Sequence, residues 1–248
     1  MYIPFSINKD EIGLLEFKQE IRHINLVQLR QDSLGFLRSC FFANSDILKG
    51  DVIKQSWLPD GKHYDFFISY SHHDEDSAIR LYQWLQSKGV SCFLDACYWN
   101  SSDELLKTLD SEYCLQPNGF YSYKKRNYST SLVHSMLSMA ILDVLDNSDF
   151  AIFIESDNSL ILNYEEIKHC TLSPWIFQEL KLIQKIDKKR PAWLKGQLRY
   201  FSSGGILNEN APIQMAFGIP SFPLLTAESL NSIKGFNETF LQHFISRY

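Results

Sequence analysis

Short apolar segments alternate with helical patterns between residues 64 and 188, and this alternation constrains the fold most strongly. The apolar segments are YDFFISY at 64–70, VSCFLD at 90–95 and FAIFIE at 150–155. Nearly continuous apolar runs of this length are typical of parallel strands that are covered on both faces. The β-α-β-α-β-α order therefore predicts an α/β protein with a flavodoxin-like, doubly wound parallel sheet.

Amphipathic helices are predicted between and after these strands, at 74–88, 130–146 and 173–188. Asp74 can cap the start of the first helix, and Gly89 can end it. Ser173 is the expected N-cap of the last helix, with Pro174 in its first turn. Beyond this helix the pattern is weaker, with expected strands near 198–201 and 222–225 and a mainly helical stretch at 227–247.

The chain divides by pattern into an appendage and a main domain. Residues 1–60 are predicted to form a helical N-terminal appendage, with helices at about 10–23 and 26–42, and the turn Pro59-Asp60-Gly61 marks its end. Residues 61–248 are predicted to form the main domain. Its polar stretch at about 96–130 is too long for an ordinary βα loop and predicts an insertion or a lid.

Composition places the chain among soluble globular proteins, because 45% of its residues are hydrophobic and 21% are charged. The net charge of −5 provides no global basic field, so neither nucleic acid nor a membrane is an expected partner. No apolar run approaches the roughly 18 residues of a membrane span. The five cysteines lack a CxxC pair, and they predict neither a disulfide framework nor a metal site. A cytoplasmic protein is expected.

Glu179 is the most informative single residue. On a helical wheel it falls on the apolar side, with Trp175 one turn before it and Ile183 one turn after it. No lysine or arginine stands three or four residues away to pair with it. A carboxylate in an apolar wall is a candidate functional group, and the alternative is that Glu179 reaches solvent at the edge of the sheet.

Ligands of doubly wound sheets bind beyond the carboxyl ends of the strands. The first strand ends at Ser69, Tyr70, Ser71 and His72, which should therefore line the mouth of a site. Asp95 ends the second strand at the same side, and the segment after Glu155 follows the third strand there. Each of these residues could instead do no more than cap or form a turn.

The segments HYDFFISYSHHDEDSAIRLYQWLQSKGVSCFLD, SDFAIFIES and SPWIFQEL together resemble the TIR domain family, over about residues 63–190. The last of them contains the W-x-x-x-E pattern of that family. The stretch YSYKKRNYSTSLVHSMLSMAI is similar to bacterial TIR proteins of the Thoeris antiphage kind. The resemblance does not extend to residues 1–60 or to the C-terminal third.

The resemblance implies an enzyme that cleaves the nicotinamide–ribose bond of NAD⁺, with Glu179 as the catalytic residue and no further cofactor. It implies an ADP-ribose-derived signal molecule in antiphage defence, and hence a separate effector protein that senses the product. Self-association of the chain is also expected. The product depends on the attacking group, which the sequence leaves open: water gives ADP-ribose, the substrate's own adenine or ribose gives a cyclic isomer, and an amino acid gives a conjugate.

Further residues are candidates for holding NAD⁺. The hydroxyls and imidazole of the first strand's end could bind adenosine or phosphate, and Trp175 could stack on a ring or simply pack in the core. Arg126, among tyrosines, could clamp the pyrophosphate or lie in a solvated loop. His134 could donate to a phosphate or be an ordinary half-buried histidine.

Other functions fit less well. A non-catalytic TIR adaptor that associates through the segment at 96–130 needs no buried carboxylate. A phosphoreceiver domain with Asp95 as the phosphate acceptor would need an acidic pair after its first strand, and this chain lacks such a pair there. A nicotinamide oxidoreductase would need a GxGxxG motif, and Gly204-Gly205 is only a turn signal. A nucleoside deoxyribosyltransferase-like enzyme would have the same kind of fold and would also use a carboxylate, so it stays a minor alternative.

Overall fold

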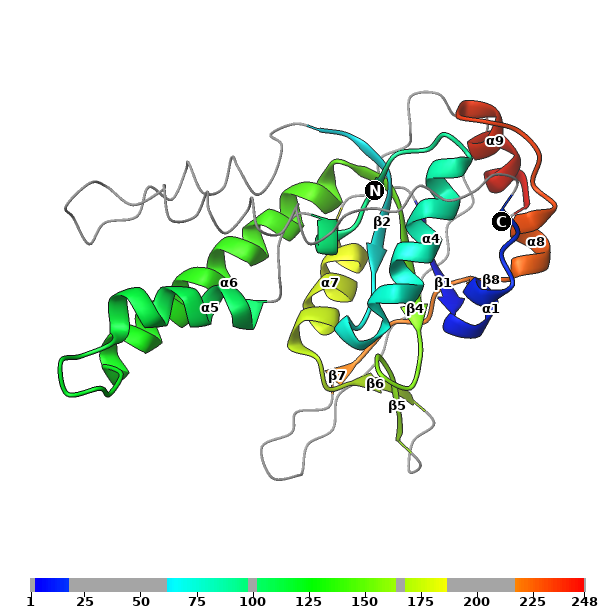
Figure 1. Ribbon diagram of the computed structural model, residues 1–248. Helices are drawn as coiled ribbons and strands as arrows, with labels where there is room; N and C mark the ends of the chain where they lie inside the picture. Colours follow the sequence, from blue (N-terminus) through cyan, green and yellow to red (C-terminus); the bar gives the residue numbers. More distant parts are fainter. Residues whose placement is uncertain (1–2, 18–61, 98–101, 164–167, 187–216, 248) are drawn as a thin grey trace. The chain divides into compact units, whose positions relative to one another are not determined.

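A five-stranded parallel sheet is the framework of the protein, and the computed structural model describes residues 3–17, 62–97, 102–163, 168–186 and 217–247 (Figure 1). The strand order is β3-β2-β4-β1-β8. The strands are β1 (Ile3–Asn8), β2 (Tyr64–Ser69), β3 (Cys92–Phe93), β4 (Ser148–Glu155) and β8 (Leu224–Leu225). Every pairing between them is parallel, and helices flank the sheet, so the predicted α/β doubly wound class is confirmed.

The chain divides into two units, which we describe separately. The first takes Met1–Arg22, His63–Leu94 and Leu145–Tyr248, and the second takes His23–Lys62 and Asp95–Val144. The first unit contains the whole parallel sheet. The helical hairpin of the segment that follows β3 belongs mainly to the second unit.

The N-terminal residues are part of the sheet, which corrects their assignment to a helical appendage. β1 pairs with β4 from Ile3↔Phe150 to Asn8↔Glu155, and it also pairs with β8. The helix that follows, α1 (Lys9–Gly13), is only five residues long. The strand was missed because its six residues include a proline and two polar side chains. The expected helix at 26–42 lies outside the described residues.

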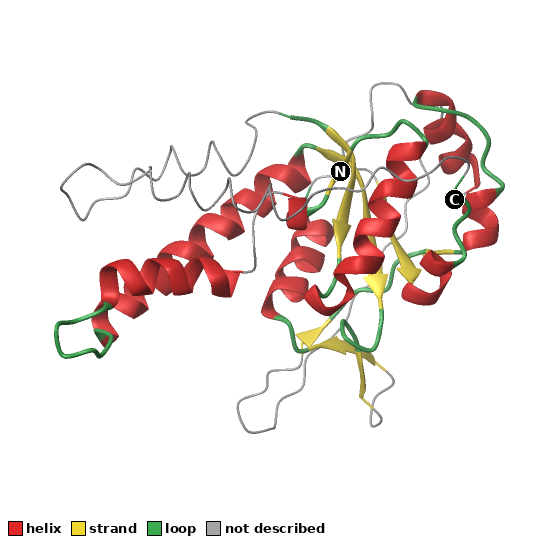
Figure 2. Cartoon of the chain, in the orientation of Figure 1, coloured by secondary structure: helices red, strands yellow, loops and turns green. Residues whose placement is uncertain are grey.

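Aromatic side chains fill both faces of the sheet. Phe66 of β2 contacts Phe150 of β4 and Phe244 of α9 (Glu238–Arg247), with ring centroids 5.2 and 5.4 Å apart. Successive side chains of a strand point to opposite faces, so Phe67 lies on the other face, where it stacks on Phe93 at 5.6 Å. Figure 2 shows helices beside the sheet, in red against yellow strands.

Helix α4 (Glu75–Ser87) follows β2 and matches the predicted helix at 74–88 closely. Its buried side chains are Ala78, Leu81, Trp84 and Leu85. Gly89 comes just after its end with a φ of +77°, and its N–H donates to the carbonyl oxygen of Gln86 at 2.8 Å. The prediction that this glycine ends the helix is therefore confirmed.

A small antiparallel sheet follows β4, and no pattern in the sequence predicted it. It consists of β5 (Ile161–Asn163), β6 (Lys168–Thr171) and β7 (Phe217–Gly218). The predicted strand near 198–201 lies outside the described residues. Near the C-terminus, the expected strand at 222–225 is the two-residue β8, and the expected helix at 227–247 is divided into α8 (Ala227–Asn231) and α9.

The described part of the second unit is mainly a helical hairpin. After η2 (Asp95–Cys97), α5 (Ser102–Leu109) continues into the π-helical turn η3 (Asp110–Cys114), and α6 (Tyr123–Asp146) runs back. Among the described helices, α6 alone is long and apolar enough to cross a membrane by length and composition. Its buried residues Val133, Leu137, Ala140, Ile141 and Val144 recur along one side, as in the core helix of a globular protein. The cytoplasmic location stays a prediction.

Candidate active site

Glu179 lies against the carboxyl end of β2. Its Oε2 accepts a 2.6 Å hydrogen bond from the hydroxyl of Ser69, the last residue of that strand. Ser69 is 1% exposed, and it points to the same face of the sheet as Phe67. A hydroxyl–carboxylate bond of this length is typical of a charge-assisted hydrogen bond. The structure therefore brings together two of the residues that the sequence singled out.

Helix α7 (Pro174–Lys185) carries Glu179, and its start is as predicted. The Ser173 side chain accepts from the Ile176 N–H, and Pro174 occupies the first turn. Ile176, Leu180 and Ile183 are buried and form the apolar stripe. At 100° per residue Glu179 lies about 60° from the middle of this stripe, on its flank.

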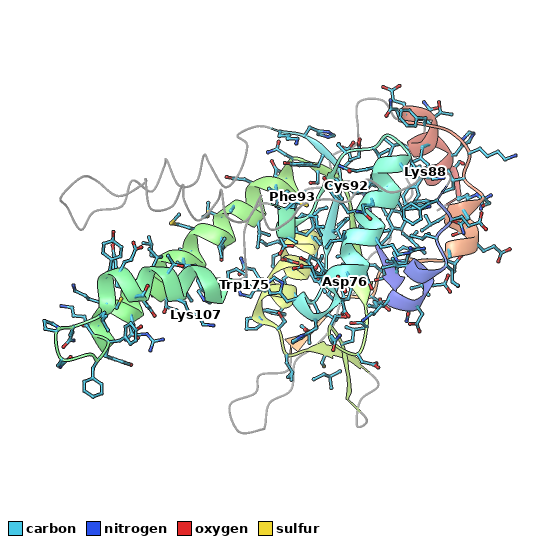
Figure 3. The ribbon with its side chains drawn as sticks, in the orientation of Figure 1. Asp76, Lys88, Cys92, Phe93, Lys107 and Trp175 are labelled. Atoms are coloured by element: carbon cyan, nitrogen blue, oxygen red, sulfur yellow. The ribbon has the colours of Figure 1, made fainter. Side chains whose placement is uncertain are left out.

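Glu179 is half-buried, which corrects its expected position near the centre of the apolar side. The helical wheel misplaced it because Trp175 and Leu182, which widened the expected apolar side, are themselves only half-buried. The flank position allows the carboxylate to reach Ser69 while the helix keeps its core contacts. Figure 3 labels Trp175 on α7, one turn before Glu179.

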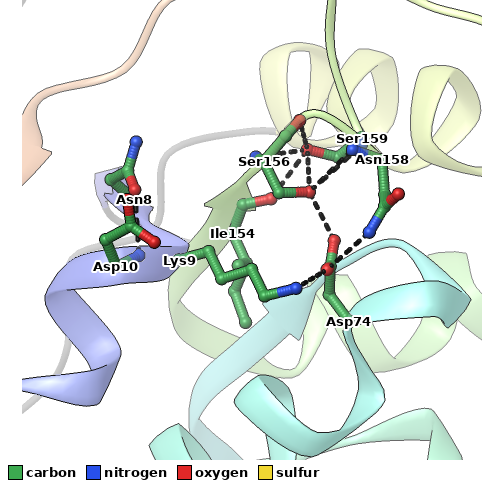
Figure 4. A network of polar contacts seen from close by, with 8 residues as sticks. All are labelled: Asn8, Lys9, Asp10, Asp74, Ile154, Ser156, Asn158 and Ser159. Atoms are coloured by element: carbon green, nitrogen blue, oxygen red, sulfur yellow. Dashed lines mark hydrogen bonds and ion pairs between the residues drawn. The ribbon is translucent and has the colours of Figure 1, made fainter.

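A second polar cluster joins the loops after three strands at the same edge of the sheet (Figure 4). Asp74 accepts from the Lys9 ammonium at 2.6 Å, from the Asn158 amide at 2.8 Å and from the Ser156 hydroxyl. Lys9 follows β1, Asp74 follows β2, and both Ser156 and Asn158 follow β4. Ser159, which is buried, donates to the carbonyl oxygen of Ile154 at 3.0 Å and fixes the last of these loops.

Asp74 is the N-cap residue of α4, as predicted, but its side chain is engaged in this cluster and makes no capping hydrogen bond. Burial raises the pKa of the Asp74 carboxyl, but hydrogen bonds from Lys9, Ser156 and Asn158 more than offset that effect, so the pKa lies below its ordinary value. The same hydrogen bond and charge raise the pKa of Lys9. The pair is therefore ionised at neutral pH, and it fixes the geometry of the sheet edge.

The remaining residues at the end of β2 differ in exposure. Tyr70 and Ser71 are buried, and the carbonyl oxygen of Ser71 accepts from the Asp74 N–H at 2.7 Å in the short helix η1 (His72–Asp74). His72 is exposed, with its ring centroid 6.4 Å from that of Tyr70. Their expected contacts with adenosine or phosphate stay predictions.

Asp95, Arg126 and His134 belong to the second unit, and their expected roles toward NAD⁺ also stay predictions. Asp95 is half-buried and accepts from the Ala96 N–H at 2.7 Å, as a turn residue does. The Arg126 Nε donates to Asp110 at 2.8 Å, so one edge of this guanidinium is already bound within the protein. His134 is exposed on α6.

Lys9 was not predicted from the sequence, whereas Ser156 and Asn158 lie in the segment after Glu155, which was expected at the ligand side of the sheet. The signal for this segment is that it directly follows a strand at the ligand side of the sheet. Lys9 carried no signal once residues 1–60 were assigned to an appendage. Only the sheet pairing of β1 brings it to this edge.

A possible metal-binding group lies at the start of β2 and β4, the opposite end of these strands. The ligand atoms of His63, Asp65 and Asp149 all lie within 4.8 Å of one another, with the His63 ring 3.1 Å from Asp149. Asp65 also accepts from the N–H and the hydroxyl of Ser91.

The cysteines Cys92, Cys97, Cys114 and Cys170 are free thiols, and Cys40 lies outside the described residues.

Comparison of the chain with protein-family models, with curated proteins and with solved structures gives no match. The resemblance to TIR domains therefore rests on the sequence motifs, and the α/β fold rests on the observed sheet.

Proposed function

We propose that the protein is a TIR-type enzyme that cleaves the nicotinamide–ribose bond of NAD⁺ and makes an ADP-ribose-derived signal molecule. The observation that supports this most directly is the position of Glu179, half-buried at the ligand side of a parallel sheet and hydrogen-bonded to the buried Ser69. The W-x-x-x-E motif selects the same residue.

The chemistry asks for a negative charge beside the sugar. Nicotinamide leaves as a neutral molecule, taking the electron pair of the bond to C1′, and the ribose gains oxocarbenium character as in glycoside hydrolysis. A carboxylate fixed near C1′ stabilises this positive charge, and it can accept hydrogen bonds from the ribose hydroxyls. The Ser69 hydroxyl occupies Oε2, so it orients the Glu179 carboxylate before substrate arrives.

The attacking group decides the product. Water gives ADP-ribose, an adenine or ribose atom of the substrate gives a cyclic isomer, and an amino acid gives a conjugate. In each case the nucleophile's electron pair forms the new bond to C1′ and its proton is released. We favour transfer or cyclisation over hydrolysis, because proteins of the Thoeris kind resemble signal-producing enzymes.

The test is incubation of the purified protein with NAD⁺, followed by mass spectrometry of the products with and without free amino acids. We expect release of nicotinamide together with one dominant ADP-ribose derivative. Glu179→Gln keeps the shape and removes the charge, so it should abolish release while the circular dichroism spectrum is unchanged. Glu228→Gln, on the exposed side of α8, is the matched control and should retain activity.

No nicotinamide release even at high protein concentration would instead support the TIR adaptor, which acts through association of domains. Full activity of the Glu179→Gln variant would remove this residue from the mechanism.

A further inference from the structure

The turn between η3 and α6, together with the start of α6, exposes a group of large apolar side chains. We call residues 115–128 the hairpin tip. Of the eleven large hydrophobic side chains exposed in the described part of the chain, five lie in the hairpin tip: Leu115, Phe120, Tyr121, Tyr123 and Tyr128. Phe120 is 73% exposed and Tyr123 80%. Exposed apolar side chains are normal when scattered, but a cluster of them marks an interaction site.

The charge of the hairpin tip is opposite to that of the chain. It contains Lys124, Lys125 and Arg126 and no acidic residue, whereas the whole chain carries −5. Lys124 and Lys125 are exposed. Arg126 is bound to Asp110, and its guanidinium carbon lies 5.5 Å from the Tyr121 ring centroid. The apolar patch is therefore bordered by two exposed ammonium groups that can meet a negatively charged partner.

Hydrogen bonds hold the hairpin tip in this shape. The N–H of Gln116 donates to Phe120 at 2.9 Å, and that of Ser122 donates to Cys114 at 2.7 Å. Leu115 and Tyr121 form an antiparallel bridge.

The Asp110 carboxylate fastens the base of the turn. It accepts from the Ser129 hydroxyl at 2.6 Å, from Arg126 at 2.8 Å and from the Cys114 thiol at 3.3 Å. Burial raises the pKa of Asp110, but these three hydrogen bonds more than offset it, so the pKa lies below its ordinary value. An ordered turn loses little entropy on binding, so its exposed side chains are well placed to dock.

We propose that the hairpin tip docks on an anionic lipid surface. Leu115 and Phe120 lie at the end of the hairpin and can enter the boundary between headgroups and acyl chains. Tyrosine rings are enriched at that level of a bilayer, and Lys124 and Lys125 would meet lipid phosphates. Single-stranded nucleic acid is a less fitting occupant, because it is held in a basic groove that follows its backbone, and the aliphatic Leu115 has no role there.

This proposal is independent of NAD⁺ cleavage, and it departs from the expectation of no membrane partner. That expectation rested on the net charge, which conceals a local excess of positive charge on one turn. Anionic lipids respond to charge within about 10 Å, so the local excess decides binding.

The experiment is flotation of the full chain with vesicles of phosphatidylcholine alone or mixed with phosphatidylglycerol. We expect binding to the anionic vesicles that weakens as salt is raised. Lys124→Gln with Lys125→Gln should lower the partition coefficient by about 25-fold, since each basic residue near the surface contributes about fivefold. Phe120→Ser should also reduce binding, by removing the side chain that inserts.

Two matched control variants make the same kinds of substitution at exposed positions outside the hairpin tip. Met139→Ser removes an exposed apolar side chain of α6 outside the hairpin tip, and Lys234→Gln removes an exposed charge of the first unit. Both should bind vesicles like the parent. All five substituted side chains are exposed, so the variants should keep their circular dichroism spectra.

Several outcomes would overturn the proposal. These are no binding to anionic vesicles at low salt, equal binding to neutral vesicles, or unchanged binding by the lysine and Phe120 variants. Binding of a fluorescent oligonucleotide, lost in the same variants while vesicles are ignored, would assign the surface to nucleic acid. A concentration-dependent dimer in sedimentation that Phe120→Ser abolishes, again without vesicle binding, would assign it to a second copy.

Discussion

Ser69 and Glu179, separated by 110 residues in sequence, are joined by a hydrogen bond of 2.6 Å at the carboxyl end of β2. The serine hydroxyl is buried and donates to a carboxylate that is only half-buried. One oxygen of Glu179 is thus occupied by the protein. The hydrogen bond fixes the direction in which the carboxylate presents its charge.

We expect Ser69→Ala to lower kcat for NAD⁺ cleavage by about tenfold or more, because a hydrogen bond to a charged group contributes roughly 1.5–3 kcal/mol. If the serine acts by positioning Glu179, KM should change less than kcat, whereas a comparable rise in KM would show that Ser69 also contacts the substrate. Steady-state kinetics of the parent and of Ser69→Ala gives kcat and KM for this comparison.

Ser6→Ala is the matched control for this effect. Ser6 is equally buried, in strand β1 of the same sheet, and its hydroxyl makes no hydrogen bond with the described residues. Its removal should leave turnover unchanged. Equal losses in the two variants would show that shortening any buried serine of this sheet impairs the enzyme, and the positioning role would then be rejected.

Asp74 should make stability depend on acidic pH. Because its folded pKa lies below the ordinary value of 3.8, its ionised form stabilises the folded state above that pH, and the contribution is lost as the pH falls through the folded pKa. Asp74→Asn should lower the free energy of unfolding by on the order of 2 kcal/mol at pH 7. Urea titrations from neutral to acidic pH should show the difference narrowing below about pH 4.

Asp157→Asn is the control for the pH effect. Asp157 is exposed in the same loop as Ser156 and should give a curve parallel to the parent. A difference between parent and Asp74→Asn that stays constant down to the lowest pH would contradict the assignment.

Gly89→Ala should destabilise the fold by more than 1 kcal/mol, in thermal or urea unfolding. The glycine has a φ of +77°, and a Cβ there would come within 2.3 Å of the Phe236 ring. Gly13→Ala is the comparison, because Gly13 has open space around its Cβ position and no positive φ. The Gly13→Ala variant should be as stable as the parent or slightly more stable. If Gly89→Ala were as stable as Gly13→Ala, the turn at Gly89 would be shown to rearrange freely.

Ile7→Ala should cost about 2–4 kcal/mol of unfolding free energy, as for other large-to-small changes in a core. Ile7 is fully buried in β1, between β4 and β8. An appendage residue would cost almost nothing, which makes the substitution a direct test of the position of β1. Leu14→Ala, at a site that is 64% exposed, should have little effect.

The sequence predicted the elements whose apolar side chains are continuous or regularly spaced. β2, β4 and α4 appear within two residues of their expected positions and α7 within three, because core burial imposes a period that the pattern reveals. β1 and the small antiparallel sheet were missed, since strands of two to six residues with mixed polarity resemble loops. Pairing with distant strands stabilises them, and such pairing leaves no local trace.

The candidate site was also predictable only in part, namely for the residues that stand out in a local pattern. Glu179 and Ser69 could be singled out because one interrupts an apolar face and the other ends a buried strand. The Lys9–Asp74 ion pair could not, because it depends on a strand whose presence in the sheet was not recognised. The position of Asp74 as the N-cap of α4 was predictable, but the bond of its side chain to Lys9 was not.

The place of β1 has a consequence for how the chain acquires its fold. β1 is synthesised before both of its partner strands, which come more than a hundred residues later, as the pairs Ile3↔Phe150 and Ser6↔Leu224 show. While the residues between these strands are being made, the edges of β1 lack the strands with which they pair in the folded protein. Folding is slow when contacts join distant residues, so β1, with its apolar Phe5 and Ile7, must be kept from aggregating until β4 and β8 have been synthesised.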